Sequence, residues 1–218
     1  MNKVLEKEYR KYKLYFYNEK YEEILKNIIN KKYEVIKEFK NDNRTYVAKI
    51  RVNNKIFLLK KPFFKRKTKK YLSLFKKGES LETFSNINKL QDKGIYELVS
   101  VYGAGVLRKG FIREEFFLME FFQGEICLED KYYEKIVEVT KKIHSLGYYH
   151  GDCNPYNFLF DENDNIKILD TKCKKMVFGN YKAHYDMLTI GRYFKGKFKH
   201  PYRKELFYSI AFFMKRGK

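Results

Sequence analysis

The chain has 218 residues, and 47 Lys and Arg against 27 Asp and Glu give it a net charge of +20. This length suits one globular domain or two small lobes that share a cleft, and the charge implies an anionic partner such as nucleotide phosphate, nucleic acid, a membrane face or a phosphorylated substrate. No apolar run approaches the roughly 18 residues that span a bilayer, and residues 1–13 lack the apolar stretch of a signal peptide. The cysteines and histidines do not have the spacing of metal ligands. We therefore expect a soluble or peripheral cytoplasmic protein with reduced cysteines.

The first half of the chain is predicted to be rich in strands. Alternating apolar and polar residues predict strands at residues 13–17, 33–39, 45–52, 55–60, 98–107 and 114–122. A short amphipathic helix is expected at 21–30 and a basic helical stretch at 67–93. Polar turn-formers at 41–43 and 53–54 separate three of the strands and indicate a meander.

The second half changes to helical character beyond Gly124. Helices are predicted at residues 131–146, 182–194 and 201–215, and short strands at 158–160 and 166–169. This order predicts an α+β fold of two lobes, a β-rich N-lobe at 1–122 and a short, mainly helical C-lobe at 123–218.

One group of polar residues in the second half of the chain has the composition and spacing of an active site. His150-Gly151-Asp152 is followed by Asn157, and Asp170 closes an apolar strand thirteen residues later. Phosphoryl transfer requires these residue types, because Mg²⁺ prefers hard oxygen ligands such as those of Asn157 and Asp170. Asp152 would then orient an acceptor hydroxyl and accept its proton. Taken singly, each residue also fits a turn or a strand cap.

Two histidines of this segment are given structural roles. His150 is expected to hydrogen-bond the backbone near Asp170 and brace the loop, and not to act as a general base. His144 precedes the loop on a predicted helix, where a packed core histidine is at least as good an interpretation as any functional one.

These residues resemble the catalytic loop and the metal-binding aspartate of the protein-kinase-like superfamily, near its aminoglycoside-phosphotransferase and RIO-like branches. The whole chain is similar to lipopolysaccharide core heptose kinases. The segments that carry this similarity are FLLK at 57–60, LFKKG at 74–78, FLMEF at 117–121 with Gly124-Glu125, and residues 150–174. The resemblance implies a two-lobed protein-kinase-like fold, ATP and Mg²⁺ as cofactors, and an inner-core lipopolysaccharide sugar as acceptor.

The resemblance also implies a nucleotide site in the N-lobe. Lys60 at the end of a strand would pair with Glu82 of the next helix, with Lys61 and Glu79 as rivals. Glu120 to Phe122 would form the hinge and offer backbone groups to adenine. Asp186 matches a buried aspartate that anchors the catalytic loop in this superfamily, although an ordinary helix N-cap is an equal alternative.

Two departures from the superfamily pattern concern the loops. Residues 41–45 contain no glycine, so asparagine, Arg44 and turn amides would have to substitute for a glycine-rich phosphate loop. Thr171-Lys172 follows Asp170, and no long activation segment comes after it. The second departure favours a small-molecule acceptor over a protein.

The sequence thus predicts an ATP-dependent kinase for a heptose of the lipopolysaccharide inner core. Basic residues at 61–77 and 195–216 would hold this anionic glycolipid at the inner face of the cytoplasmic membrane, an anionic surface that attracts Lys and Arg. The alternatives are a kinase for another small molecule or a protein, and a non-catalytic binding protein of kinase fold. A nucleic-acid partner is not expected, because it would leave the catalytic motif unexplained.

Overall fold

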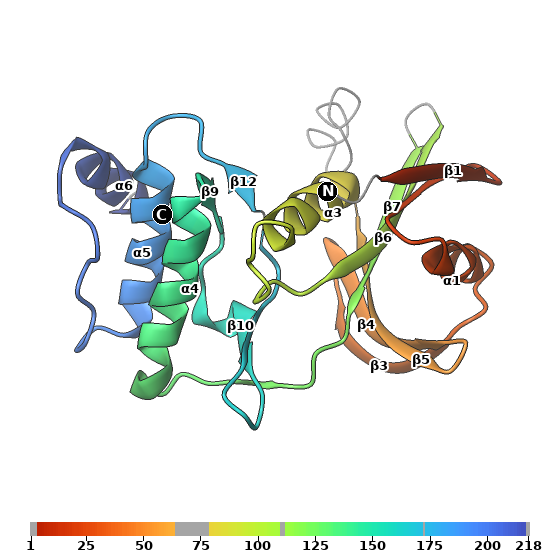
Figure 1. Cartoon of the computed structure of the whole chain (residues 1–218), viewed down its shortest axis with the longest axis horizontal. Helices are drawn as coiled ribbons and strands as arrows, with labels where there is room; N and C mark the ends of the chain where they lie inside the picture. Colours follow the sequence, from red (N-terminus) through yellow and green to blue (C-terminus); the bar gives the residue numbers. More distant parts are fainter. Residues whose placement is uncertain (1–3, 64–78, 110–111, 172, 217–218) are drawn as a thin grey trace. The chain divides into compact units, whose positions relative to one another are not determined.

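The structure is a computed structural model that describes residues 4–63, 79–109, 112–171 and 173–216. It divides into two compact units (Figure 1). The N-lobe comprises Met1–Asp92 and Val99–Phe121, and the C-lobe comprises Lys93–Leu98 and Phe122–Lys218. The division after Phe121 lies one residue before the boundary in our prediction, and the short segment 93–98 joins the C-lobe. The predicted α+β class is confirmed.

The described residues of the N-lobe form a seven-stranded antiparallel sheet in the order β1-β2-β6-β7-β5-β4-β3. Its strands are β1 (Leu5–Tyr9), β2 (Tyr12–Phe16), β3 (Glu34–Asn41), β4 (Thr45–Val52), β5 (Lys55–Pro62), β6 (Val101–Lys109) and β7 (Ile112–Glu120). The predicted meander is β3-β4-β5, joined by turns at 42–44 and 53–54. In the latter, Asn53 and Asn54 adopt positive φ angles of 48° and 59°, which asparagine tolerates better than most residues.

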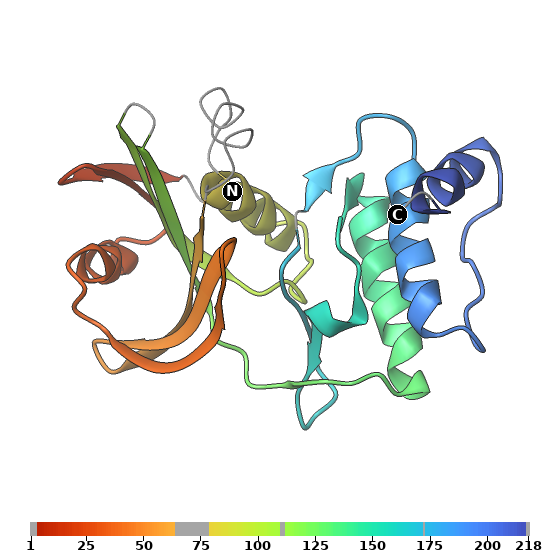
Figure 2. The same cartoon turned by 180° about the vertical axis from the view of Figure 1, so that it is seen from behind.

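Two helices cover opposite faces of this sheet, α1 (Lys20–Ile29) and α3 (Glu79–Gln91), as Figures 1 and 2 show. Successive strand residues point to opposite faces. Phe116 and Leu118 of β7 therefore join the core that α1 covers, where Leu25 is fully buried. The alternate residues of β7 point to the face of α3, and that face carries the predicted nucleotide residues.

The C-lobe consists of helices and short hairpins in its described part. Its elements are β8 (Glu125–Ile126), the 3₁₀ helix η1 (Asp130–Tyr132), α4 (Tyr133–Ser145), β9 (Tyr148–Tyr149), the 3₁₀ helix η2 (Pro155–Asn157), β10 (Phe158–Phe160), β11 (Ile166–Ile168), β12 (Lys174–Lys175), α5 (Tyr181–Tyr193) and α6 (Leu206–Arg216). Helix α4 buries Ile136, Val139 and Ile143, the face that its periodicity predicts. It packs beside α5, and α5 packs beside α6 (Figures 1 and 2).

The structure departs from the predicted elements in two places, and a third prediction falls partly outside the described residues. Strand β1 was missed because Leu5–Tyr9 carries charged residues on an exposed sheet edge. Of the basic helix expected at 67–93, residues 67–78 lie outside the described residues. The last helix begins at Leu206 and not at 201, because the tertiary contacts of Tyr202 hold residues 201–205 outside the helix.

No helix among the described residues is both long enough and apolar enough to cross a membrane.

Candidate active site

The predicted catalytic loop connects β9 to β10 in the C-lobe. Its second half turns through η2, where Asn154 is the N-cap: its side-chain oxygen accepts a hydrogen bond from the backbone N–H of Tyr156 at 3.1 Å. Pro155 occupies the first position of η2, which needs no N–H donor and suits its fixed φ angle. The local sequence therefore determines the turn that connects Asp152 to Asn157.

Asp152 and Asn157 are brought together by this turn. The side-chain N–H of Asn157 donates to the backbone carbonyl of Asp152 at 2.8 Å, and the backbone N–H of Asn154 donates to the same carbonyl at 2.7 Å. Because the side-chain nitrogen of Asn157 donates this bond, its side-chain oxygen faces no such demand within the described residues and can coordinate a cation. The Asp152 carboxylate itself is exposed, as a group that meets a substrate must be.

Asp170 follows β11 and is tied to the same loop on both sides. The backbone N–H of Leu169 donates to the carbonyl of Asn157 at 2.7 Å, and the hydroxyl of Thr171 donates to the carbonyl of His150 at 3.1 Å. Asp170 adopts a φ of +44°, in the left-handed region that non-glycine residues rarely occupy. The three predicted chemical residues thus share one hydrogen-bonded framework.

Asp186 anchors the catalytic loop from α5. Its carboxylate is buried and accepts hydrogen bonds from the backbone N–H groups of His150 at 2.7 Å and Gly151 at 3.0 Å. The Nε2 atom of His144 lies 3.1 Å from the same carboxylate. Since Asn180, and not Asp186, is the N-cap of α5, the anchoring interpretation is confirmed and the capping alternative is wrong.

His150 is fully buried, and its bracing contact differs from the predicted one. Its Nδ1 accepts from the backbone N–H of Asp152 at 3.3 Å, while Nε2 has no hydrogen-bond partner among the residues that the structure describes. The bond to the backbone near Asp170 is made instead by the His150 carbonyl, which accepts from Thr171. Burial lowers the pKa of His150, so the ring stays neutral and is not placed to serve a substrate as a base.

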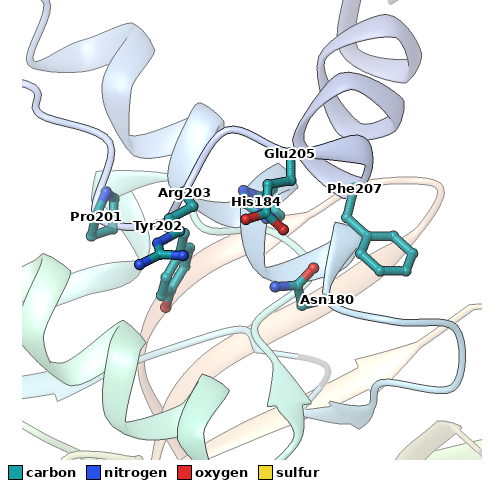
Figure 3. Close-up of a pocket in the computed structure, with 7 residues that line it drawn as sticks. All are labelled: Asn180, His184, Pro201, Tyr202, Arg203, Glu205 and Phe207. Carbon is teal, nitrogen blue, oxygen red and sulfur yellow. The ribbon is translucent and has the colours of Figure 1, made fainter.

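His144 belongs to a buried polar cluster that sequence reasoning did not foresee. Its Nδ1 lies 2.7 Å from the hydroxyl of Tyr202. Tyr202 in turn lines a cavity of about 340 Å³ whose walls are shown in Figure 3 and comprise Asn180, His184, Pro201, Tyr202, Arg203, Glu205 and Phe207. His144 therefore links the cavity wall to the carboxylate that anchors the catalytic loop.

All three cysteines are free thiols, as expected. Cys153 lies in the catalytic loop but is buried, and burial raises its thiol pKa. Burial likewise raises the pKa of Cys173 to about 12. Both remain protonated at neutral pH and have no character of a nucleophile.

In the N-lobe, the structure separates the two rival lysines. Lys60 of β5 pairs with Phe117 of β7, and its ammonium lies 5.7 Å from the centre of that ring. Glu115, two residues before Phe117, reaches the backbone N–H of Ser80 at the start of α3 at 2.9 Å. Lys60 therefore points to the face of the sheet that α3 covers.

Lys61 points to the other face. Its ammonium donates to the hydroxyl of Tyr33 at 3.1 Å and lies over the ring of Tyr46 at 5.7 Å. Tyr46 packs against the core beneath α1. Because α3 carries the rival glutamates, this geometry favours Lys60 over Lys61.

The glutamate partner of Lys60 stays a prediction. Glu82 lies in the first turn of α3 and is half-buried, whereas Glu79 is the first residue of that helix and its side chain lies outside what the structure describes. Sequence reasoning missed Glu115, which is buried on β7 and accepts from the α3 N-terminus. Its only signal is a charged residue directly before the apolar run of residues 116–119.

The predicted hinge runs from Glu120 to Phe122, across the division between the two units. The carboxylate of Glu120 accepts from the backbone N–H of Ser100 at 3.1 Å, and its own backbone N–H donates to the Ser100 carbonyl at 2.9 Å. Its side chain therefore fastens β7 to the start of β6, which agrees with giving only backbone groups of the hinge to adenine.

The glycine-free loop between β3 and β4 uses its amides internally. The carboxylate of Asp42 accepts from the backbone N–H groups of Arg44 at 2.7 Å and Thr45 at 2.8 Å. These two bonds lower the pKa of Asp42 and keep it charged. The expectation that turn amides here replace a glycine-rich phosphate loop is therefore wrong for these two amides.

The residues present fit a magnesium ion that is held jointly with a nucleotide. No cluster of three or more His, Cys, Asp or Glu suitable for a metal exists within the described residues. Mg²⁺ in phosphoryl-transfer sites is usually bound by one or two protein oxygens together with substrate phosphates and water. The exposed carboxylate of Asp170 and the uncommitted amide oxygen of Asn157 suit that arrangement.

Comparisons with known proteins find partial similarity to several kinases. The chain is 38% identical over 56 residues to a 3-deoxy-D-manno-octulosonic acid kinase of Vibrio parahaemolyticus, covering 25% of this chain and 24% of that protein. It is 32% identical over 68 residues to CBL-interacting protein kinase 15 of Oryza sativa subsp. japonica, covering 25% and 16%. A third match is to the RIO-type serine/threonine-protein kinase Rio2 of Methanocaldococcus jannaschii, 47% identical over 36 residues, covering 16% and 13%.

The chain matches less than a quarter of the length of each of these relatives. The family model described as "Lipopolysaccharide core biosynthesis protein (WaaY)" matches residues 3–216, almost the whole chain. The protein therefore belongs to the WaaY family of lipopolysaccharide core biosynthesis proteins.

Proposed function

We propose that this protein is an ATP-dependent kinase that phosphorylates a hydroxyl of a lipopolysaccharide inner-core sugar, with a heptose as the expected acceptor. Membership in a lipopolysaccharide core biosynthesis family supports the pathway, and similarity to a sugar kinase and to protein kinases supports phosphoryl transfer. The observation that carries the proposal is the exposed Asp152, whose carbonyl receives the amide of Asn157 within a loop anchored by Asp186.

The roles follow from what each group can do. The carboxylate of Asp152 orients the acceptor hydroxyl and accepts its proton as the oxygen attacks the γ-phosphorus of ATP, whose bond to the β,γ-bridging oxygen breaks so that ADP leaves. Asn157 and Asp170 supply oxygens for Mg²⁺, which when bound neutralises the charge of the nucleotide phosphates. Lys60, with Glu82 as partner, contacts the phosphates, and the backbone of 120–122 contacts adenine. Catalysis then rests on positioning and on charge stabilisation.

The charge of the chain fits this acceptor. The inner core of lipopolysaccharide is anionic, and the chain carries +20. Electrostatic attraction raises the rate of encounter with an anionic acceptor or surface and disfavours a cationic acceptor. We extend the proposal to a location at the inner face of the cytoplasmic membrane, where the acceptor is assembled and where anionic lipids attract Lys and Arg.

The direct test measures transfer of labelled γ-phosphate from Mg-ATP to unphosphorylated inner-core lipopolysaccharide. A generic protein substrate and the Asp152→Asn variant serve as controls. Label on the glycolipid that disappears in the variant supports the proposal. Label on the protein substrate alone, or equal labelling by the variant, contradicts it.

One observation favours a second candidate, a non-catalytic binding protein of kinase fold. Asp42 occupies two loop amides and brings a negative charge to the loop that covers phosphates in kinases. Thermal shift with Mg-ATP separates the candidates, because a protein that does not bind nucleotide gains no stability from it.

A further inference from the structure

The C-lobe exposes four large apolar side chains on two segments that contact each other, and we call this group the apolar ridge. It consists of Val177 and Phe178 in the loop before α5, and Leu206 and Phe213 on α6. Their exposed fractions are 94%, 64%, 70% and 81% respectively. Single exposed apolar residues are ordinary, whereas a contiguous group indicates a surface that contacts something apolar.

The loop and the helix form one surface because they pack against each other. The ring of Phe178 lies 5.8 Å from that of Phe207, edge to face. Gly179 adopts a φ of +50°, and a Cβ at this position would lie only 2.2 Å from the Phe207 ring. The close approach of loop to helix therefore requires glycine, and it holds Val177 and Phe178 beside the first turn of α6.

Basic residues lie beside both segments of the ridge. The ammonium of Lys182 lies over the ring of Tyr181 at 4.9 Å, and that ring contacts Phe178 at 6.3 Å. The ammonium of Lys204 lies over the ring of Tyr208 in α6 at 5.6 Å. Arg203, next in the chain, lines the adjoining cavity together with Phe207 (Figure 3).

The charge of this part of the chain selects the occupant. Residues 171–218 contain 13 Lys and Arg but only two acidic residues, Asp186 and Glu205, a net charge of +11. Asp186 is buried, which leaves Glu205 as the exposed acidic residue of this segment. Apolar side chains that project from a basic surrounding match a lipid bilayer with anionic headgroups, whose interior is apolar and whose surface is negative.

We propose that the apolar ridge is a membrane-docking surface, through which Val177, Phe178, Leu206 and Phe213 enter the headgroup region of an anionic bilayer while Lys182, Arg203 and Lys204 contact its headgroups. The purpose of the surface rests on the proposed function, since a kinase for a membrane glycolipid must work at the bilayer. The proposal goes beyond charge attraction, because it assigns the contact to particular apolar residues.

The chain contains no tryptophan, so one introduced tryptophan reports on its own surroundings. The experiment uses full-length Phe213→Trp and Val177→Trp variants, with Tyr96→Trp as the matched control. Tyr96 also lies in the C-lobe and is 71% exposed, but it is outside the ridge. Each variant is mixed with vesicles of phosphatidylcholine alone or with about one third phosphatidylglycerol, an anionic lipid, and its emission is recorded with and without brominated lipid.

We expect a blue shift and quenching by brominated lipid for Phe213→Trp and Val177→Trp with anionic vesicles, and neither for Tyr96→Trp. The double variant Val177→Ser with Phe213→Ser should bind anionic vesicles at least about tenfold more weakly, because burial of two apolar side chains is lost. Unchanged ridge emission on vesicles that do sediment the protein would overturn the proposal. The proposal would also be overturned if high protein concentration alone produced the blue shift of the tryptophan emission. The ridge would then be covered by a second copy of the chain.

A water-soluble acceptor distinguishes failure of the proposed enzyme activity from failure of the proposed membrane docking. The double serine variant should transfer phosphate to deacylated core oligosaccharide at the parent rate and lose transfer to lipopolysaccharide in anionic vesicles. If no variant phosphorylates either acceptor, the function is wrong, while the fluorescence result still decides the docking surface.

Discussion

The carboxylate of Asp186 accepts a hydrogen bond from the backbone N–H of His150 at 2.7 Å, although the two residues are 36 positions apart in the chain. A second bond from Gly151 fixes the backbone immediately before Asp152. Backbone N–H groups that lose such an acceptor inside the protein pay the cost of an unsatisfied donor. The orientation of the predicted catalytic loop therefore depends on a residue of α5, a distant segment of the chain.

Substitution Asp186→Ala should lower the free energy of unfolding by about 3 kcal/mol, because it leaves the buried N–H of His150 and the half-buried N–H of Gly151 without their acceptor. Asn180→Ala is the matched control, since the Asn180 side chain makes no capping hydrogen bond, and it should change stability by less than about 0.5 kcal/mol. Urea denaturation measures both. A larger loss from Asn180→Ala than from Asp186→Ala would contradict the anchoring role.

Substitution Asp152→Asn should reduce kcat by about a thousandfold while nucleotide affinity is retained, because the amide occupies the same space but accepts no proton. Glu162→Gln, an exposed carboxylate in the β10–β11 turn, is the control and should leave kcat unchanged. Labelled-phosphate transfer gives kcat, and calorimetry gives the affinity for Mg-ATP. Normal turnover by Asp152→Asn would remove this residue from the chemistry.

Substitution Lys60→Met should raise the KM for ATP by about tenfold or more, because it removes a charge proposed to contact the phosphates. Lys61→Met provides a neighbour of the same type on the opposite face of the sheet, where it contacts Tyr33. It should alter the KM for ATP by less than about twofold. A larger effect of Lys61→Met than of Lys60→Met would show that the wrong lysine has been assigned.

Substitution Asp42→Gly should tighten Mg-ATP binding, because it frees the backbone N–H groups of Arg44 and Thr45 and removes a negative charge. Asp42→Asn removes the charge but keeps a side-chain oxygen for the two N–H groups, so it separates these effects. We expect the order of affinity Asp42→Gly, then Asp42→Asn, then the parent, measured by calorimetry. Weaker binding by the glycine variant would mean that the Asp42 turn itself supports the nucleotide.

Stability should fall as the pH is lowered from about 6.5 to about 4. Burial lowers the pKa of His200 from 6.5 to about 4, and the nearby His184 and Lys204 lower it further. The unfolded chain therefore binds more protons than the folded protein in this range, and the stability present above pH 6.5 is lost on acidification.

The His200→Gln variant tests this origin. Its free energy of unfolding should decline less steeply than that of the parent between pH 7 and pH 4.5, measured by urea denaturation at several pH values. Titrating groups that do not interact with His200 are common to both proteins and cancel in the comparison, and any change at His184, whose Nδ1 lies 2.8 Å from Nε2 of His200, is part of the same effect. Equal slopes would assign the acid sensitivity to other groups.

Sequence by itself determined the class of the fold, and it singled out the segment that we propose to be catalytic. The periodicity of α1, β4, β5 and α4 follows from local rules, because each of these elements buries one face and ends at turn residues, whereas β3 is exposed along its whole length. Asp152, Asn157 and Asp170 also lie within 19 residues of the chain, around one β-hairpin, so a local motif is enough to predict that they belong together.

Only the tertiary structure decided which groups those residues meet. The choice between Lys60 and Lys61 depends on the pairing of β5 with β7, since a shift of one residue moves a side chain to the other face. Asp186 and Tyr202 reach the loop region from distant segments, and no local pattern specifies such contacts. Asp42 shows the converse. Its loop was correctly predicted, but only the structure shows that the Asp42 carboxylate accepts hydrogen bonds from the backbone N–H groups of Arg44 and Thr45.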